Sequence, residues 1–207
     1  MLRRSYDDPR HLRFTDFNRD GHLEWTYTSY GASNRDRHNY WTSILYEARD
    51  AQWHAVIGTH GNIASPQFTQ FTYDGKLVLT LGTKGQRGRD AGRLFDRPTD
   101  IAWLPDGTFF ISDGYGGTRV AKFDKDGTFL MDWGTPPKDP SNPGPNEWNT
   151  VHSIAISDDR RLFIVDRGHR RIQVFDEHGK FLDMFTTGMR SLPYTHLITE
   201  DQYLWIA

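Results

Sequence analysis

The segment FISDGYGGTRVAKFDKDG, from Phe110 to Gly127, occurs a second time in altered form as FIVDRGHRRIQVFDEHG, from Phe163 to Gly179. Both copies contain an apolar run ending in Asp, a turn with Gly, an Arg, a second apolar run and an Asp-x-x-Gly turn. The turn glycines Gly75, Gly127 and Gly179 follow one another at steps of 52 residues. A constant period of this length indicates structural repeats.

Each full repeat contains four short apolar segments separated by turns rich in Asp and Gly. In the central repeat these segments are 100–104, 108–112, 119–124 and 128–133. Gly tolerates the positive φ of tight hairpin turns, so we expect antiparallel strands. Four strands in a repeat of roughly 40 to 50 residues are typical of a propeller blade. We therefore predict an all-β fold, an incomplete β-propeller of about three to four four-stranded antiparallel blades. An ordinary meander or sandwich is the alternative, but it does not explain the constant register.

Composition narrows the classes of function. The 207 residues carry a net charge of −2 and include no cysteine. The small net charge gives no general attraction for nucleic acid, and the lack of cysteine excludes disulfides and thiolate metal ligands. No apolar segment approaches the roughly 20 residues that span a bilayer. RNA binding is the least favoured function, because acidic residues offset the basic cluster at Arg167, Arg170 and Arg171. We expect neither a nucleic-acid partner nor a membrane span.

The repeats resemble those of NHL-repeat propellers, and more narrowly those of the peptidyl-α-hydroxyglycine α-amidating lyases, or peptidylamidoglycolate lyases. The matching stretches are RPTDIAWLPDG, SDGYGGTRVAKFDKDG and VHSIAISDDRRLFIVDRGHRRIQVFD, within a region of resemblance that covers about residues 62–207. The resemblance implies a zinc-dependent reaction that splits a carbinolamide into a peptide amide and glyoxylate. A small peptide-like substrate would be the partner.

Three residues receive roles from this resemblance. Tyr115, in the DGY turn, matches a catalytic tyrosine at the central channel, and Arg167, in the next repeat, matches an arginine that contacts the substrate. His152, in VHSIA, matches one of three zinc ligands. The residue types suit this chemistry, because neutral imidazole binds zinc and arginine forms a fork that fits a carboxylate. A tyrosine near a metal and an arginine is expected to have a lowered pKa and to act as a base.

The residues alone leave other roles open. A histidine at the start of a strand is commonly structural, and Tyr115 can pack over a turn. Arg167 can pair with Asp113 or Asp166. A non-catalytic propeller that binds a peptide, protein or glycan on its loop face is the alternative function.

The zinc ligands are incomplete in this chain. The family uses alternate blades, and the ligand position two blades before His152 is occupied by Ala48. The third position would lie beyond Ala207. We therefore expect a partial or inactive form that, as given, binds zinc weakly and shows little or no lyase activity.

A different motif, TDFNRDGHLEW, occurs at residues 15–25. Asp16, Asn18, Asp20 and Glu24 could direct oxygens at a hard cation, which predicts a calcium site. An EF-hand would need Glu at its twelfth position, where this chain has Tyr27. The motif instead resembles the calcium loop of FG-GAP (VCBS-type) repeats, and a plain turn rich in Asp and Asn is the alternative.

The chain is therefore expected to be composite, with an FG-GAP-like repeat at 1–56 and NHL-type blades at 57–207. Both of these families are mostly exported. The resemblance thus implies a periplasmic or extracellular location.

Overall fold

The computed structural model describes residues 55–58, 68–71, 77–83, 86–90, 92–188 and 190–207. The predicted calcium loop, with Asp16, Asn18, Asp20 and Glu24, lies outside the described residues, and calcium binding stays a prediction. The expected domain boundary at 56/57 falls inside strand β1 (Ala55–Gly58). The division into two domains therefore also stays a prediction.

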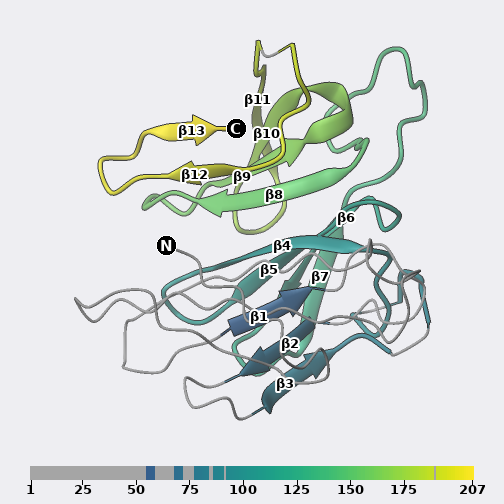
Figure 1. Cartoon of the computed structure of the whole chain (residues 1–207), viewed down its shortest axis with the longest axis vertical. Helices are drawn as coiled ribbons and strands as arrows, with labels where there is room; N and C mark the ends of the chain where they lie inside the picture. Colours follow the sequence, from purple (N-terminus) through teal and green to yellow (C-terminus); the bar gives the residue numbers. More distant parts are fainter. Residues whose placement is uncertain (1–54, 59–67, 72–76, 84–85, 91, 189) are drawn as a thin grey trace, which may run out of the picture.

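Two complete four-stranded antiparallel sheets form the centre of the molecule (Figure 1). The first contains β4 (Pro98–Trp103), β5 (Phe109–Asp113), β6 (Arg119–Phe123) and β7 (Phe129–Trp133). The second contains β8 (Val151–Ile156), β9 (Leu162–Asp166), β10 (Arg171–Phe175) and β11 (Phe181–Thr186). The predicted all-β fold with four-stranded antiparallel blades is confirmed.

Smaller sheets lie on either side of these two blades. One contains β1 with β2 (Phe68–Phe71) and β3 (Leu77–Leu81), and the other contains β12 (His196–Ile198) and β13 (Leu204–Ile206). By the 52-residue period, β2 and β3 correspond to β6 and β7. The innermost strands β4, β8 and β12 are neighbours, as Figure 1 shows.

The repeat glycines lie in equivalent turns where the structure describes them. Gly127 N donates to Asp124 O over 3.0 Å, and Gly179 N donates to Asp176 O over 3.1 Å. Their φ angles are 84° and 77°, a region that suits glycine. The predicted equivalence is confirmed for these two residues, whereas Gly75 lies outside the described residues.

Apolar side chains fill the layers between adjacent sheets. The rings of Phe68 and Phe95 meet 5.5 Å apart between the β1–β3 and β4–β7 sheets. Phe110 and Trp133 contact each other at 6.1 Å in the layer between the two complete blades. Because both faces of a blade are covered, β5, β6 and β10 are buried at every position.

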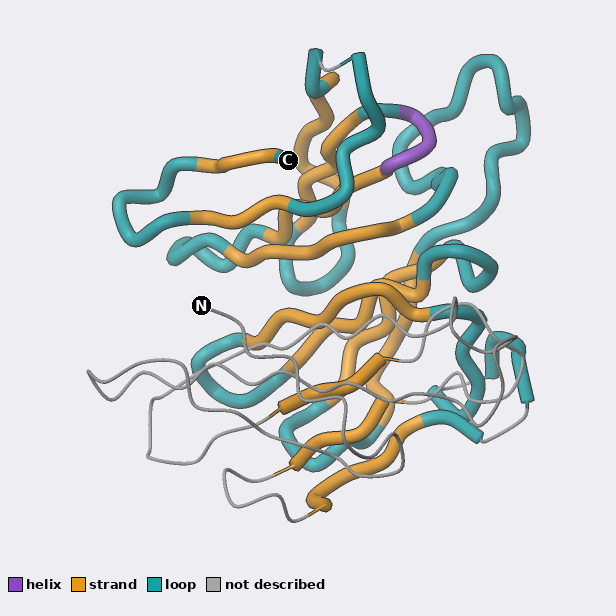
Figure 2. The backbone as a smooth tube through the Cα atoms, in the orientation of Figure 1, coloured by secondary structure: helices purple, strands orange, loops and turns teal. Residues whose placement is uncertain are grey.

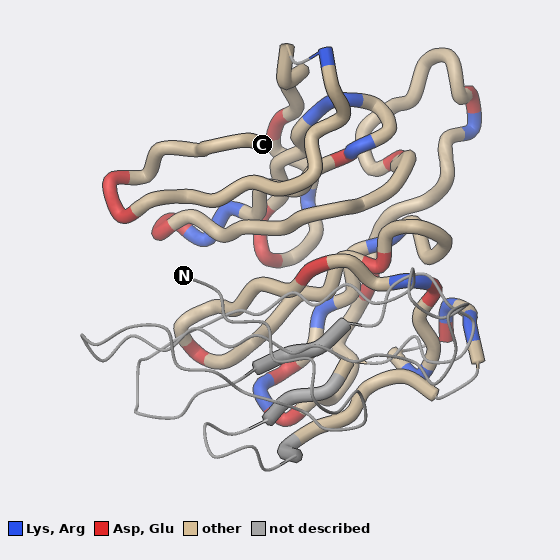
Figure 3. Tube along the Cα trace, in the orientation of Figure 1, with Lys and Arg blue, Asp and Glu red and all other residues tan. Residues whose placement is uncertain are grey.

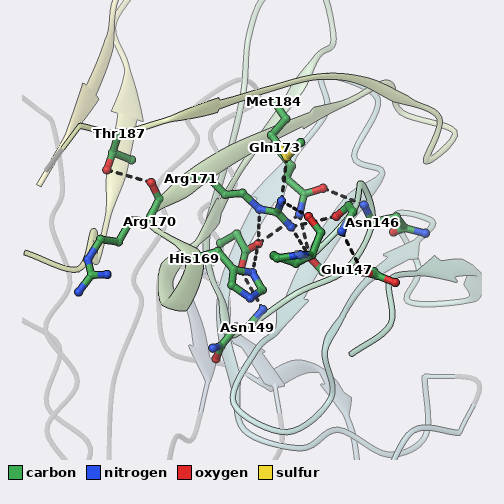
Figure 4. Close-up of polar contacts among 12 residues, drawn as sticks. Asn146, Glu147, Asn149, His169, Arg170, Arg171, Gln173, Met184 and Thr187 are labelled. Atoms are coloured by element: carbon green, nitrogen blue, oxygen red, sulfur yellow. Dashed lines mark hydrogen bonds and ion pairs between the residues drawn. The ribbon is translucent and has the colours of Figure 1, made fainter. Parts of the chain in front are cut away.

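Each complete blade contains a buried ion pair at the same place. Arg119 Nε is 3.1 Å from Asp113 Oδ2, and Arg171 Nε is 2.7 Å from Asp166 Oδ2. The guanidinium of Arg171 also donates to the main-chain oxygen of Gly144, in the loop before β8. It donates to the main-chain oxygen of Glu147 in the same loop (Figure 4). The Arg171–Asp166 pair thus connects the turn after β9 to the loop that precedes β8.

Helical structure is limited to one 3-10 turn, η1 (Arg167–His169), among the described residues (Figure 2). In that part of the chain, no helix has the length and hydropathy that crossing a bilayer requires. Acidic and basic residues are interspersed along the loops of the described trace (Figure 3).

Candidate functional site

The three residues singled out by the sequence come together at one end of the two complete blades. Tyr115 lies in the turn between β5 and β6, and His152 is the second residue of β8. Arg167 begins η1, between β9 and β10. Tyr194, two residues before the start of β12, completes the cluster, hereafter the channel-end cluster. All four side chains are at least partly exposed to solvent.

Hydrogen bonds define the protonation of His152. Its Nδ1 lies 2.5 Å from the main-chain oxygen of Tyr194, which can only accept, so Nδ1 carries the proton. The neutral ring then has a free lone pair on Nε2, and this atom lies 3.1 Å from the hydroxyl of Tyr115. Burial lowers the pKa of His152, and the charge of Arg167 acts in the same direction. The imidazole is therefore neutral at pH 7.

Arg167 packs against the two tyrosines. Its guanidinium carbon is 4.2 Å from the ring centroid of Tyr194 and 5.9 Å from that of Tyr115. Nη2 donates to the Tyr194 hydroxyl over 2.7 Å, while the buried Nε has no hydrogen-bond partner within the described part of the chain. The alternative pairing with Asp113 or Asp166 does not occur, because those carboxylates pair with the arginines of their own blades.

The pKa of Tyr115 depends on its burial and on the arginines beside it. Burial raises the pKa of its hydroxyl, and this effect outweighs the lowering by Arg167 and Arg97. This direction reflects the protein groups alone, so a lowered pKa beside a bound metal stays a prediction. At pH 7 the hydroxyl is a neutral group that donates to His152.

The close approach of the two blades explains why the turn before Tyr115 begins with glycine. A Cβ on Gly114 would lie 1.7 Å from the main-chain oxygen of Val151. Thr99 Oγ1 donates to the same oxygen over 2.7 Å, so β4 is joined to the start of β8. Glycine at 114 thus lets the Tyr115 turn reach His152.

Sequence reasoning overlooked two contributors to the cluster. Tyr194 has no metal-binding side chain and was not among the candidate residues, yet it contacts both His152 and Arg167. Arg97 donates to the main-chain oxygen of Tyr115 over 2.8 Å. The available signal was positional, because Tyr194 occupies in its repeat the place that His152 occupies in the preceding one.

Within the described ranges, the donor set is too small for a catalytic zinc ion. His152 has the arrangement of a ligand, since its second nitrogen donates to a carbonyl and its Nε2 is unprotonated. A catalytic zinc needs three protein ligands. Among the described residues there is no group of three or more His, Asp or Glu side chains that could hold a metal ion. The described residues therefore offer one candidate ligand, His152, and zinc binding stays a prediction.

The fold and the blade arrangement define the class of protein as an all-β propeller. Two similar solved structures agree with this class. The WD40 β-propeller domain of Doa1 has a TM-score of 0.54 at 10% identity, with coverage of 81% of this chain and 47% of that one. A virginiamycin B lyase from Staphylococcus aureus has a TM-score of 0.54 at 18% identity, with coverage of 89% and 54%.

Curated relatives indicate the type of propeller. NHL repeat-containing protein 3 of Homo sapiens is 33% identical over 142 residues, which are 64% of this chain and 39% of the relative. A probable peptidyl-α-hydroxyglycine α-amidating lyase of Caenorhabditis elegans is 31% identical, with coverage of 59% and 33%. Peptidyl-glycine α-amidating monooxygenase B of Xenopus laevis is 41% identical, with coverage of 47% and 11%.

These relatives support an NHL-type propeller. The chain spans only between 11% and 39% of their length. No family model matches the chain.

Proposed function

We propose that this chain is the ligand-recognition part of an amidating-lyase-type propeller and binds a peptide-like ligand through its terminal carboxylate. The observation that carries the proposal is the convergence of Tyr115, His152 and Arg167 from two adjacent blades. His152 lies on a strand, and the turns with Tyr115 and Arg167 join adjacent strands of the two sheets, which favours a defined binding geometry. The names of the relatives give the ligand class, a peptide that ends in α-hydroxyglycine.

The chemistry of the cluster suits such a ligand. Arg167 has a buried Nε–H without a partner in the described part of the chain, and a carboxylate oxygen would satisfy it. The adjacent Nη2 would complete a bidentate pair once it exchanges the Tyr194 hydroxyl for the ligand. Tyr115, as a neutral hydroxyl, can donate to a carbonyl or hydroxyl oxygen.

Calorimetry with a peptidyl-α-hydroxyglycine tests this proposal. We expect binding of that peptide and no binding of the same peptide with its carboxylate converted to an amide. Arg167→Gln should weaken binding by about 10- to 100-fold, the usual worth of hydrogen bonds to a charged group. Arg170→Gln, at an exposed neighbouring position, is the matched control and should bind normally. Equal affinity for the acid and the amide would contradict the proposal.

Lyase activity is the second candidate, and the names of the relatives favour it. Glyoxylate release should be measured with and without added zinc, for the unmodified chain, Tyr115→Phe and His152→Ala. Because the described residues supply a single zinc ligand, we expect binding without zinc-dependent turnover. Robust turnover that both variants abolish would replace the binding proposal with an active lyase.

The location of the protein and the classes of its partners are also proposals. The resemblance alone suggests a periplasmic or extracellular location. The small net charge suggests that nucleic acid is not a partner. A protein or glycan ligand on the loop face is the alternative to a peptide.

A further inference from the structure

Three polar side chains from three sheets form a chain of hydrogen bonds beside the channel-end cluster. Asp100 lies on β4, Ser153 on β8 and His196 on β12. Ser153 Oγ is 2.8 Å from Asp100 Oδ2, and His196 Nδ1 is 3.0 Å from the same hydroxyl oxygen. Ser153 and His196 are 2% and 7% exposed. These bonds connect the innermost strands of successive blades.

The residue types are those of a hydrolase triad, but the surroundings do not permit that function. The hydroxyl of Ser153 is enclosed and has no room for a substrate. His196 Nε2 is engaged with the main-chain oxygen of Phe163 at 2.8 Å. The group therefore needs a different explanation.

A count of protons provides one. The Phe163 oxygen can only accept, so His196 Nε2 carries a proton. The single proton of Ser153 can serve either His196 Nδ1 or Asp100, but not both. Both contacts are hydrogen bonds only if one more proton is present. That proton is either on Asp100, with Ser153 donating to His196, or on His196, with Ser153 donating to Asp100.

We propose that Asp100 and His196 hold this one proton in common through Ser153, and that the bridge fixes β12 against β8. Tyr194 lies two residues before His196, and its main-chain oxygen accepts from His152. The bridge thus positions Tyr194 in the channel-end cluster.

The environment supports a neutral bridge. Burial raises the pKa of Asp100 to about 6, against the effect of its hydrogen bonds, and lowers the pKa of His196 to about 4. In the folded protein the shared proton therefore resides on Asp100 between these values, and His196 is neutral.

The other ionisable groups on the packed strands are occupied elsewhere. On β5 and β9, Asp113 and Asp166 pair with arginines. On β8, His152 contacts the two tyrosines of the channel-end cluster. Neither β4, β12 nor β13 contributes another charged side chain.

The two pKa shifts have opposite consequences for stability. The raised pKa of Asp100 contributes stability that is present below pH 3.8 and is lost as the pH rises through about 6. The lowered pKa of His196 contributes stability that is present above pH 6.5 and is lost as the pH falls through about 4. In the unmodified chain the two effects nearly cancel, because Asp100 and His196 together bind about the same number of protons in the folded and unfolded states.

Single substitutions should reveal the two slopes separately. The folding equilibrium constants can be measured by urea unfolding between pH 4 and 7. For Asp100→Asn this constant should fall about 100-fold as the pH is lowered, because the pKa shift of His196 is then uncompensated. For His196→Gln the folding equilibrium constant should fall about 100-fold as the pH is raised toward 7, because the pKa shift of Asp100 is then uncompensated. Both changes are differences from the unmodified chain, whose own pH dependence comes from its other ionisable groups, Asp113 and His152 among them. Asp183→Asn and His178→Gln, at exposed positions, are the matched controls.

The shared proton also predicts a rescue. At pH 5, where Asp100 holds the shared proton, the amide of Asp100→Asn can donate to Ser153 as the protonated carboxyl does, whereas Asp100→Ala cannot donate. Asparagine should therefore preserve the imidazole ¹⁵N shifts of His152, and alanine should change them.

Nuclear magnetic resonance of the unmodified chain tests the proposal without relying on a variant that folds. The ¹⁵N shifts of His196 should show the Nε2–H tautomer, neutral at pH 5. A His196 that titrates near pH 6.5, or an Asp100→Asn variant with the same pH dependence as the unmodified chain, would overturn the proposal.

Discussion

Replacing Gly114 with alanine tests whether the close approach of the two complete blades builds the channel-end cluster. The new Cβ would lie 1.7 Å from the Val151 oxygen and 3.1 Å from Cγ2 of Thr99. Non-bonded heavy atoms need about 3.5 Å, so the turn and β8 must move apart by more than about 1 Å. Overpacking of this kind costs about 1–3 kcal/mol. The movement also breaks the 2.7 Å bond from Thr99 Oγ1, at about 1 kcal/mol.

We therefore expect Gly114→Ala to lower the free energy of unfolding by about 2–4 kcal/mol, and the melting temperature by about 5–15 °C. Urea unfolding and calorimetry measure these changes. Gly144→Ala is the matched control, because its Cβ would meet only the flexible end of Glu147 at 3.7 Å. Gly114→Ala, unlike the control, should also lose the Tyr115–His152 contact, and this loss should be visible in the imidazole ¹⁵N shifts of His152. Unchanged stability together with unchanged shifts would refute the reasoning.

Other perturbations have equally definite outcomes. Arg119→Met leaves the buried carboxylate of Asp113 without its partner and should cost about 3–5 kcal/mol in urea unfolding, with Lys125→Met as an exposed control. The pKa of His152 is lowered, so its contribution to stability is present above pH 6.5 and is lost as the pH falls. His152→Gln should accordingly be less sensitive to acid than the unmodified chain in thermal unfolding below pH 6.5. Calcium at millimolar concentration should release heat in titration calorimetry, and Asp20→Ala should abolish that heat; an identical signal from the variant would leave only the turn interpretation.

The strands and their order could be predicted from the sequence because turn residues separate the strands at the same places in each repeat. Gly127 and Gly179 need a positive φ, and the Asp three residues before each closes the same turn. The expected segment 119–124 differs from β6 by one residue, since the turn begins at Asp124. These are local constraints, and local constraints can be read from one chain.

The channel-end cluster was only partly accessible to such reasoning. Tyr115, His152 and Arg167 were identified through resemblance, whereas Tyr194 lacked any chemical signature. The pKa of Tyr115 could not be obtained from residue types, because it depends on how much solvent the neighbouring blades exclude.

The bridge from Asp100 to His196 was invisible for a similar reason. Its members come from three repeats, and their residue types alone do not indicate that they meet. Hydrogen bonds between blades depend on how the sheets are rotated against each other, and nothing in the local pattern specifies that rotation.

In the connection from β7 to β8, Arg171 donates hydrogen bonds to main-chain oxygens and not to side chains. The blade therefore constrains the path of that segment while leaving most of its sequence unspecified. A protein engineer could exchange residues 136–142 for a foreign recognition peptide and retain the anchor at Pro143, Gly144 and Glu147. The same latitude would let natural selection diversify this connection without rebuilding the sheets beneath it.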